Sequence, residues 1–208
     1  MKGQSLLENI YGVFFHPIET FRHLSARQEV GRSMLIFSGV YLFGALMKIA
    51  LADPALPPVG IWPGTPPLNE VAGDLLGIGA IIGVILALFF LFVAAALFHL
   101  IAEALGGTGT GMGLLAALGF AFLPQLPYSI ASFVAEVLRL PTLFNRLAWL
   151  GFFAWVVVLL VLALRESENL TTGRAVLALA LPFMALGILT VVAAILVALV
   201  LLPSGFSF

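Results

Sequence analysis

His99 and Glu103 offer the clearest prospect of chemistry in this chain, because they lie four residues apart at the end of a long uncharged stretch. Residues four apart share one face of a helix. Such a pair could bind a metal ion, relay protons or hydrogen-bond another helix. A metal ion needs a third or fourth ligand, and the chain has only 3 histidines and no cysteine. A metal site at His99 and Glu103 is therefore one hypothesis, and a polar pair that closes a helix end is the structural alternative.

A second polar group surrounds two prolines that lie three residues apart, Pro124 and Pro127. Each proline removes a backbone donor, so a helix kink is predicted there. The freed carbonyls, with Gln125 and Tyr128, could line a cavity as broken helices do in transporters. Neighbouring hydroxyl groups could equally satisfy those carbonyls without any transport.

The glycines between these two groups predict a tight turn, centred on Gly106 and Gly107. A phosphate-binding loop would need a lysine or a metal-binding acid at a fixed spacing, and neither follows. The chain also contains no HExxH, no GxSxG and no pair of aspartates within an apolar stretch. We expect no enzyme activity and no cofactor.

Composition dictates the elements that must position these residues. Hydrophobic residues make up 62% of the 208 residues and charged residues 9%, against about 25% charged in soluble domains. A net charge of −1 argues against a nucleic-acid partner.

A membrane-spanning helix needs roughly 20 mostly apolar residues. The sequence predicts an all-α membrane bundle of five transmembrane helices in residues 34–202, at about 34–52, 75–101, 112–133, 147–164 and 175–202. Residues 53–74, which hold half of the prolines, are predicted to form an extended connector.

Residues 1–33 precede the first span and show apolar residues at helical spacing, interrupted near His16. We predict two short amphipathic helices there. They could lie in the membrane interface or pack against the cytoplasmic face of the bundle. The candidate membrane-interface residues are Phe14, Phe15, Phe21, Arg22 and Arg27.

Lys and Arg predict the orientation, because cytoplasmic segments carry an excess of them. With a cytoplasmic N-terminus, the inside segments hold Lys2, Arg22, Arg27, Arg32, Arg165 and Arg174, and the outside segments hold Arg139 and Arg146. The C-terminus, with a short tail at 203–208, is then predicted to be external.

Three segments resemble the Yip domain family, five-span membrane proteins that interact with Ypt/Rab GTPases, and in particular its bacterial branch. They are HPIETFRHL at 16–24, the run from Phe98-His99-Leu100 to Leu105-Gly106-Gly107, and LGFAFLPQLP at 118–127. The resemblance implies five spans and a bacterial inner-membrane location. The Asp-Leu-Tyr-Gly-Pro element typical of eukaryotic members is absent, so GTPase binding is not carried over.

Three functional hypotheses follow from these features. The first is a non-enzymatic membrane protein that organises the membrane or partner proteins through its N-terminal segment. The second is a small transporter or ion channel with a cavity at the kinked third span. The third is a metal-binding membrane protein. The predicted partners are the lipid bilayer, a protein at the N-terminal segment and a second copy of the chain.

Overall fold

The computed structural model describes residues 5–50 and 68–201, and every regular element in these ranges is an α-helix. The helices are α1 (Leu6–Phe15), α2 (Pro17–Arg27), α3 (Val30–Ala50), α4 (Leu68–Ala104), α5 (Gly111–Ala121), α6 (Gln125–Val137), α7 (Thr142–Glu168) and α8 (Thr172–Leu201). Five helical stretches are long and apolar enough to cross a membrane. The predicted all-α class, with five spans and two short N-terminal helices, is confirmed.

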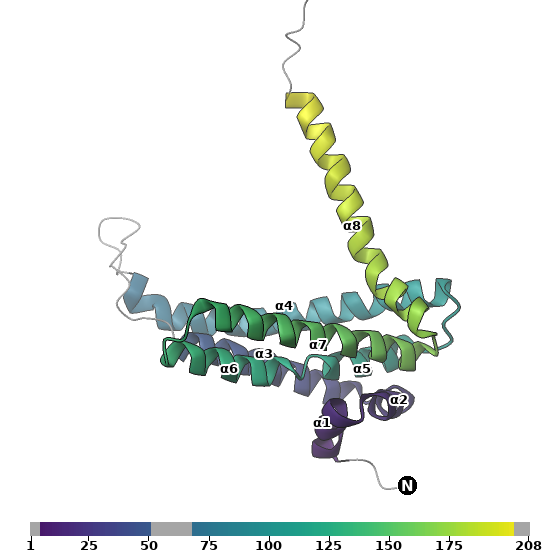
Figure 1. The fold of residues 1–208 in the computed structure, drawn as a ribbon, viewed down its shortest axis with the longest axis horizontal. Coiled ribbons are helices and arrows are strands. Elements are labelled where there is room, and N and C mark those ends of the chain that lie inside the picture. The colour runs from purple at the N-terminus through teal and green to yellow at the C-terminus, as the bar shows by residue number, and fades with distance from the viewer. Residues whose placement is uncertain (1–4, 51–67, 202–208) are drawn as a thin grey trace, which may run out of the picture.

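The helices α3 to α7 run alongside one another, with α5 and α6 together forming one span (Figure 1). The short helices α1 and α2 cross this direction beneath the end where α5 begins. Helix α8 packs on α4 and α7 only near its start and then leaves the bundle, so its most apolar stretch has no buried residue.

Helix α4 differs most from its prediction, because it begins at Leu68 rather than near residue 75. Residues 68–74 are therefore helical, although we expected them to extend the proline-rich connector. The physical reason is that the last proline of that connector is Pro67, after which nothing breaks a helix. The predicted tail at 203–208 and the connector at 53–67 lie outside the described residues.

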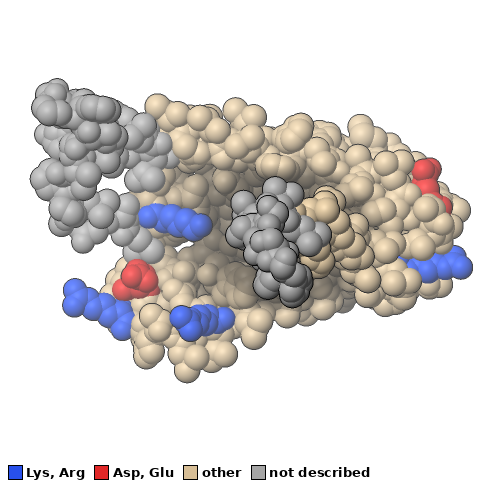
Figure 2. All heavy atoms as spheres, turned by 90° about the horizontal axis from the view of Figure 1, so that it is seen from above, with Lys and Arg blue, Asp and Glu red and all other residues tan. Residues whose placement is uncertain are grey.

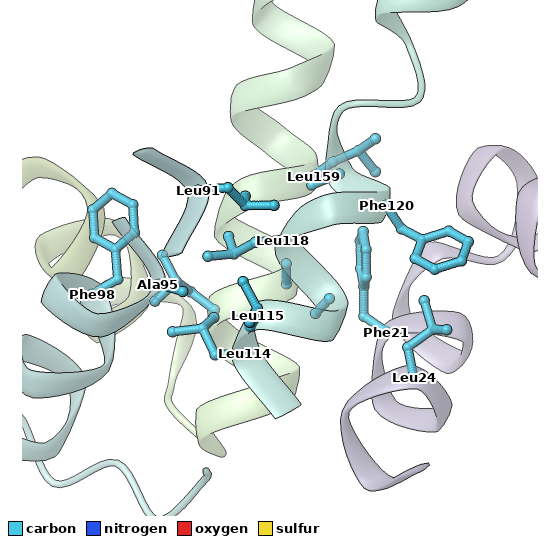
Figure 3. Close-up of a cluster of buried hydrophobic side chains, with 14 of the residues drawn as sticks. Phe21, Leu24, Leu91, Ala95, Phe98, Leu114, Leu115, Leu118, Phe120 and Leu159 are labelled. Carbon is cyan, nitrogen blue, oxygen red and sulfur yellow. The ribbon is translucent and has the colours of Figure 1, made fainter. Parts of the chain in front are cut away.

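Helix α5 occupies the centre of the bundle. Its residues from Gly113 to Ala121 are all buried, whereas the other spans expose most of their surface. It contacts α2, α3, α4 and α7, and to a smaller extent α1. Figure 3 shows leucines of α5 beside Leu91 and Phe98 of α4 on one side, and Phe120 beside Phe21 and Leu24 of α2 on the other.

The third span is interrupted between Ala121 and Gln125. Pro124 cannot donate to the carbonyl of Phe120, and Pro127 cannot donate to Leu123, so two helical hydrogen bonds are lost. The chain makes tighter bonds here instead, from Leu123 N to Phe120 O at 3.1 Å and from Gln125 N to Phe122 O at 3.0 Å. The span changes direction at this break, and α6 leaves the centre that α5 occupies.

The surface is divided as a bilayer requires. On the face shown in Figure 2, Lys, Arg, Asp and Glu lie toward the two ends and the surface between them is uncharged. Large apolar side chains such as Ile81, Phe90 and Leu150 are more than half exposed in this belt. In water such a surface would drive aggregation, whereas in lipid it matches the solvent.

Close approach of α3 to α5 depends on Gly119. A Cβ placed there would collide with the Ser33 side chain and lie 2.9 Å from the Ser33 carbonyl oxygen. We expect Gly119→Ala to lower the free energy of unfolding by about 1–3 kcal/mol through overpacking. The measurement is unfolding of the purified chain in detergent, followed by circular dichroism.

Gly151→Ala is the matched control, because a Cβ at Gly151 meets nothing within 4 Å. Both substitutions raise the helix propensity equally, because each replaces glycine with alanine. The difference between their free energies of unfolding therefore reports the collision with Ser33 alone. Equal stability of the two variants would contradict close packing at Gly119.

Candidate functional site

Local interactions define the ends of the two N-terminal helices and the contact between them. Ser5 and Glu8 form a capping box, with Glu8 N donating to Ser5 Oγ at 3.2 Å and Ser5 N donating to Glu8 Oε2 at 2.6 Å. His16 separates α1 from α2, and Pro17 starts α2 where its missing N–H costs nothing. Thr20 of α2 fits against Gly12 of α1 where no Cβ intervenes. The two helices predicted around His16 are therefore present as a closely packed pair.

Helix α2 docks this pair onto the bundle. Phe21 and Leu24 are fully buried against α5 and α7. Arg22 Nη2 lies 2.8 Å from Glu166 Oε2, which adds an ion pair from α2 to the end of α7. Phe21 was among the predicted membrane-interface residues, but its side chain contacts protein rather than lipid. Arg27 remains partly exposed beside Glu29.

Helix α1 leaves an apolar stripe uncovered. Leu7, Tyr11 and Phe15 follow each other at four-residue spacing and are 74%, 58% and 64% exposed. On the side of α1 that faces the bundle, Phe14 lines a shallow hollow with Phe152 and Trp155 of α7. Because these two α7 residues lie within a span-length helix, α1 lies at the edge of the apolar belt rather than clear of it.

A buried carboxylate lies at the same end of the bundle. Glu168, the last residue of α7, is fully buried, and its Oε1 is 2.8 Å from His99 Nδ1 of α4. Its backbone carbonyl accepts from Thr108 N at 3.0 Å, and the next residue, Asn169, donates to Thr108 Oγ1 at 3.2 Å. A Cβ at Gly109 would collide with the backbone of α7 here. Glu168 thus ties the ends of α4 and α7 to the 105–110 turn.

The predicted pair of His99 and Glu103 is weaker than the pair of His99 and Glu168. His99 Nε2 and Glu103 Oε1 are 3.8 Å apart, and Glu103 is 57% exposed. In the described part of the chain, no three His, Asp or Glu side chains are grouped so that they could hold a metal ion. Glu168 lies beyond the predicted span at 147–164, and its contact with His99, 69 residues away, leaves no local signal in the sequence.

The glycine turn closes α4. Gly106 adopts φ of 87°, a left-handed conformation that suits glycine, and Gly107 N donates to Ala102 O at 2.8 Å. Gly107 could not carry a Cβ, which would lie 2.9 Å from that same oxygen. These two glycines therefore serve the backbone geometry that brings α5 back beside α4.

Beside the broken third span lies a groove of about 980 Å³, lined by α3, α4, α6, α7 and the first half of α8. Gln125 and Tyr128 line it, whereas Pro124 is buried under the break. Pro127 lies in the first turn of α6. Lys48 and Tyr41 of α3 also line the groove, and sequence reasoning did not place them in a cavity.

The comparison with protein families gives one match. A family model described as the Yip1 domain matches residues 11–202, which is nearly the whole chain. No curated protein and no solved structure matches this chain. The matched range includes α2, the glycine turn and the broken third span.

Loss of the buried carboxylate should destabilise this end of the bundle. We expect Glu168→Ala to lower the free energy of unfolding by about 2–3 kcal/mol, because it leaves a cavity and His99 without its partner. Glu103→Ala, which removes an exposed acid from the same histidine, should cost less than about 0.5 kcal/mol. Thermal unfolding in detergent measures both, and equal melting temperatures would contradict the role given to Glu168.

Proposed function

This chain belongs to the Yip1 domain family, and we propose that it is a non-enzymatic protein that organises the bilayer or partner proteins through residues 1–33. Its five apolar helices, with the family match, make it an integral multi-pass membrane protein. The resemblance seen in the sequence is thereby confirmed at the level of the family.

One observation carries the proposal: an apolar stripe lies uncovered on α1, which packs with α2 across the end of the bundle. Burying Leu7, Tyr11 and Phe15 in lipid or against a partner would be favourable by about 1.5–3 kcal/mol for each side chain. The apolar face of α2 is buried against the bundle, so it stabilises the fold. The stripe of α1 has no such contact within the described part of the chain and is available to lipid or to a partner.

Charge supports a cytoplasmic position for this segment. Arg22, Arg27 and Arg32 lie near α1 and α2, and Arg165 and Arg174 lie near the turn between α7 and α8. We place this end in the cytoplasm of a bacterial cell, with the protein in the inner membrane and the C-terminus external. Anionic lipid headgroups attract such basic clusters by about 1 kcal/mol per residue.

The other two hypotheses receive less support. A transport site must open alternately to the two sides of the membrane. The groove beside α6 could hold a ligand, but the described residues outline no opening to the opposite side. Metal binding lacks a grouped set of ligands in the same residues. We propose neither as the function.

Single-cysteine labelling tests the depth of α1, since the chain has no native cysteine. Tyr11→Cys would carry an environment-sensitive fluorophore in the full chain, reconstituted in vesicles of phosphatidylglycerol and phosphatidylcholine. We expect blue-shifted emission that nitroxide-labelled lipids quench. Glu103→Cys, exposed at the same end, is the control and should respond to aqueous iodide instead. A Tyr11 label that behaves as the Glu103 label does would refute the lipid contact.

A photo-crosslinking amino acid at Ile18 tests the partner half of the proposal in cells. Ile18 is 39% exposed at the start of α2. We expect a discrete protein adduct at Ile18 and none at Ile81, which lies in the lipid-facing belt and is 62% exposed. Adducts of the same size at both positions would mean that the segment selects no partner.

A further inference from the structure

The groove beside α6 has one polar wall and one apolar wall. Gln125, Ser129 and Ser132 lie along α6 at spacings of four and three residues, so they share one face, and Lys48 of α3 lines the same groove. Tyr41 of α3 lines it too, with its ring against Gly83 of α4. The opposite wall is formed by α4, with Ala80, Ala87 and Leu91. A cavity of about 980 Å³ is at the upper end of the range for ligand sites. Its two walls suit a molecule that is itself amphipathic.

The groove opens sideways into the apolar belt. Three lining residues, Phe90, Trp149 and Phe183, are also at least half exposed on the uncharged surface. Figure 2, which looks down on the face from which α8 rises, shows this face hollowed beside α8. A ligand would therefore enter from the hydrocarbon of the bilayer rather than from water.

Lys48 supplies the only charge among the described lining residues. It lies in the last turn of α3, close to the membrane end opposite α1 and α2. Among the described side chains no carboxylate lies within ion-pair distance of its amine. A cation that has no carboxylate partner among the described side chains, beside a hydrocarbon groove at the depth of the headgroups, favours an anionic group.

We propose that this groove binds one anionic phospholipid from the surrounding bilayer. Lys48 binds the phosphate, the hydroxyl and amide groups of α6 meet the glycerol ester region, and an acyl chain lies along α4. The site goes beyond the proposed function, which rests on α1 and α2 at the other end of the bundle.

Helix α8 is the other segment that could fill the groove, from the same chain or from a second copy. Its residues from Ala175 to Ala198 carry one polar side chain, Thr190, and no charge. It would cover the apolar wall, but with Thr190 as its one polar side chain it offers Lys48 no anionic partner. A phospholipid matches both walls.

Native mass spectrometry of the full chain, purified in detergent, tests the site. The chain is incubated with equal amounts of phosphatidylglycerol and phosphatidylcholine that carry the same acyl chains. We expect one retained lipid and a preference of roughly tenfold for phosphatidylglycerol, because the positive charge of choline makes phosphatidylcholine neutral and repels the Lys48 amine. Lys48→Gln should remove the preference and Lys48→Arg should keep it. Equal binding of the two lipids by the unaltered chain would overturn the proposal.

A filling substitution separates this site from general lipid adhesion. Gly79 lines the groove and a Cβ there meets nothing within 4 Å, so Gly79→Phe places a ring in the open space. Gly77 meets nothing within 4 Å either and does not line the groove, so Gly77→Phe is the matched control. We expect Gly79→Phe to lose the retained lipid and Gly77→Phe to keep it. Retention by both variants would place the lipid elsewhere.

Cysteine pairs test the competing occupant in the otherwise cysteine-free chain. Thr190→Cys combined with Ser132→Cys joins α8 to α6 only if α8 enters the groove, within one chain or between two. We expect no disulfide in vesicles that contain phosphatidylglycerol. Efficient disulfide formation there would show that α8, not lipid, occupies the groove.

Discussion

Close packing around α5 is the constraint on which the rest of this structure depends. Lipid tails are as apolar as leucine, so helices in a membrane gain little from hiding apolar surface and associate through van der Waals contact. Helix α5 meets this condition with small residues, including Gly113, Ala116 and Ala117, all buried. Neighbouring helices can therefore approach it closely, and Gly119 against Ser33 is the tightest example on α5.

The proline break limits how far this packing extends. If α5 continued straight beyond Ala121, one narrow helix would run through the whole bundle. The chain instead turns at Phe122–Pro124, and α6 packs mainly against α3 and α7. The space that α6 leaves beside α4 becomes the groove. The same span thus builds a dry centre at one end and an open lateral site at the other.

Much of this organisation was predictable from local sequence. Five apolar stretches predicted five long helices, and the spacing around His16 predicted two short ones. Pro124 and Pro127 indicated where the third span would change direction, since a missing N–H acts on its own turn. Such features depend on nearby residues alone.

Contacts between distant residues were not predictable in this way. Phe21 looked like a lipid-facing aromatic, because an amphipathic helix shows the same pattern whether it meets lipid or protein. Glu168 was not assigned to a span, because α7 extends four residues beyond its predicted end and carries this residue beneath the glycine turn. Lys48 has no neighbour in the sequence that indicates a cavity, and only the position of α6 places it beside a groove.

Hydrogen exchange of α2 in the intact chain, in lipid nanodiscs, tests the central claim most directly. The claim is that packing around α5 fixes the N-terminal helices across the bundle. Helix α2 lies at the end of the bundle, so its amide protection reports docking on protein rather than coverage by hydrocarbon. We predict that the amides from Phe21 to Leu24 exchange at least a hundredfold more slowly than those of an unfolded peptide, roughly 3 kcal/mol of protection. Exchange at the rate of an unfolded peptide would contradict this account.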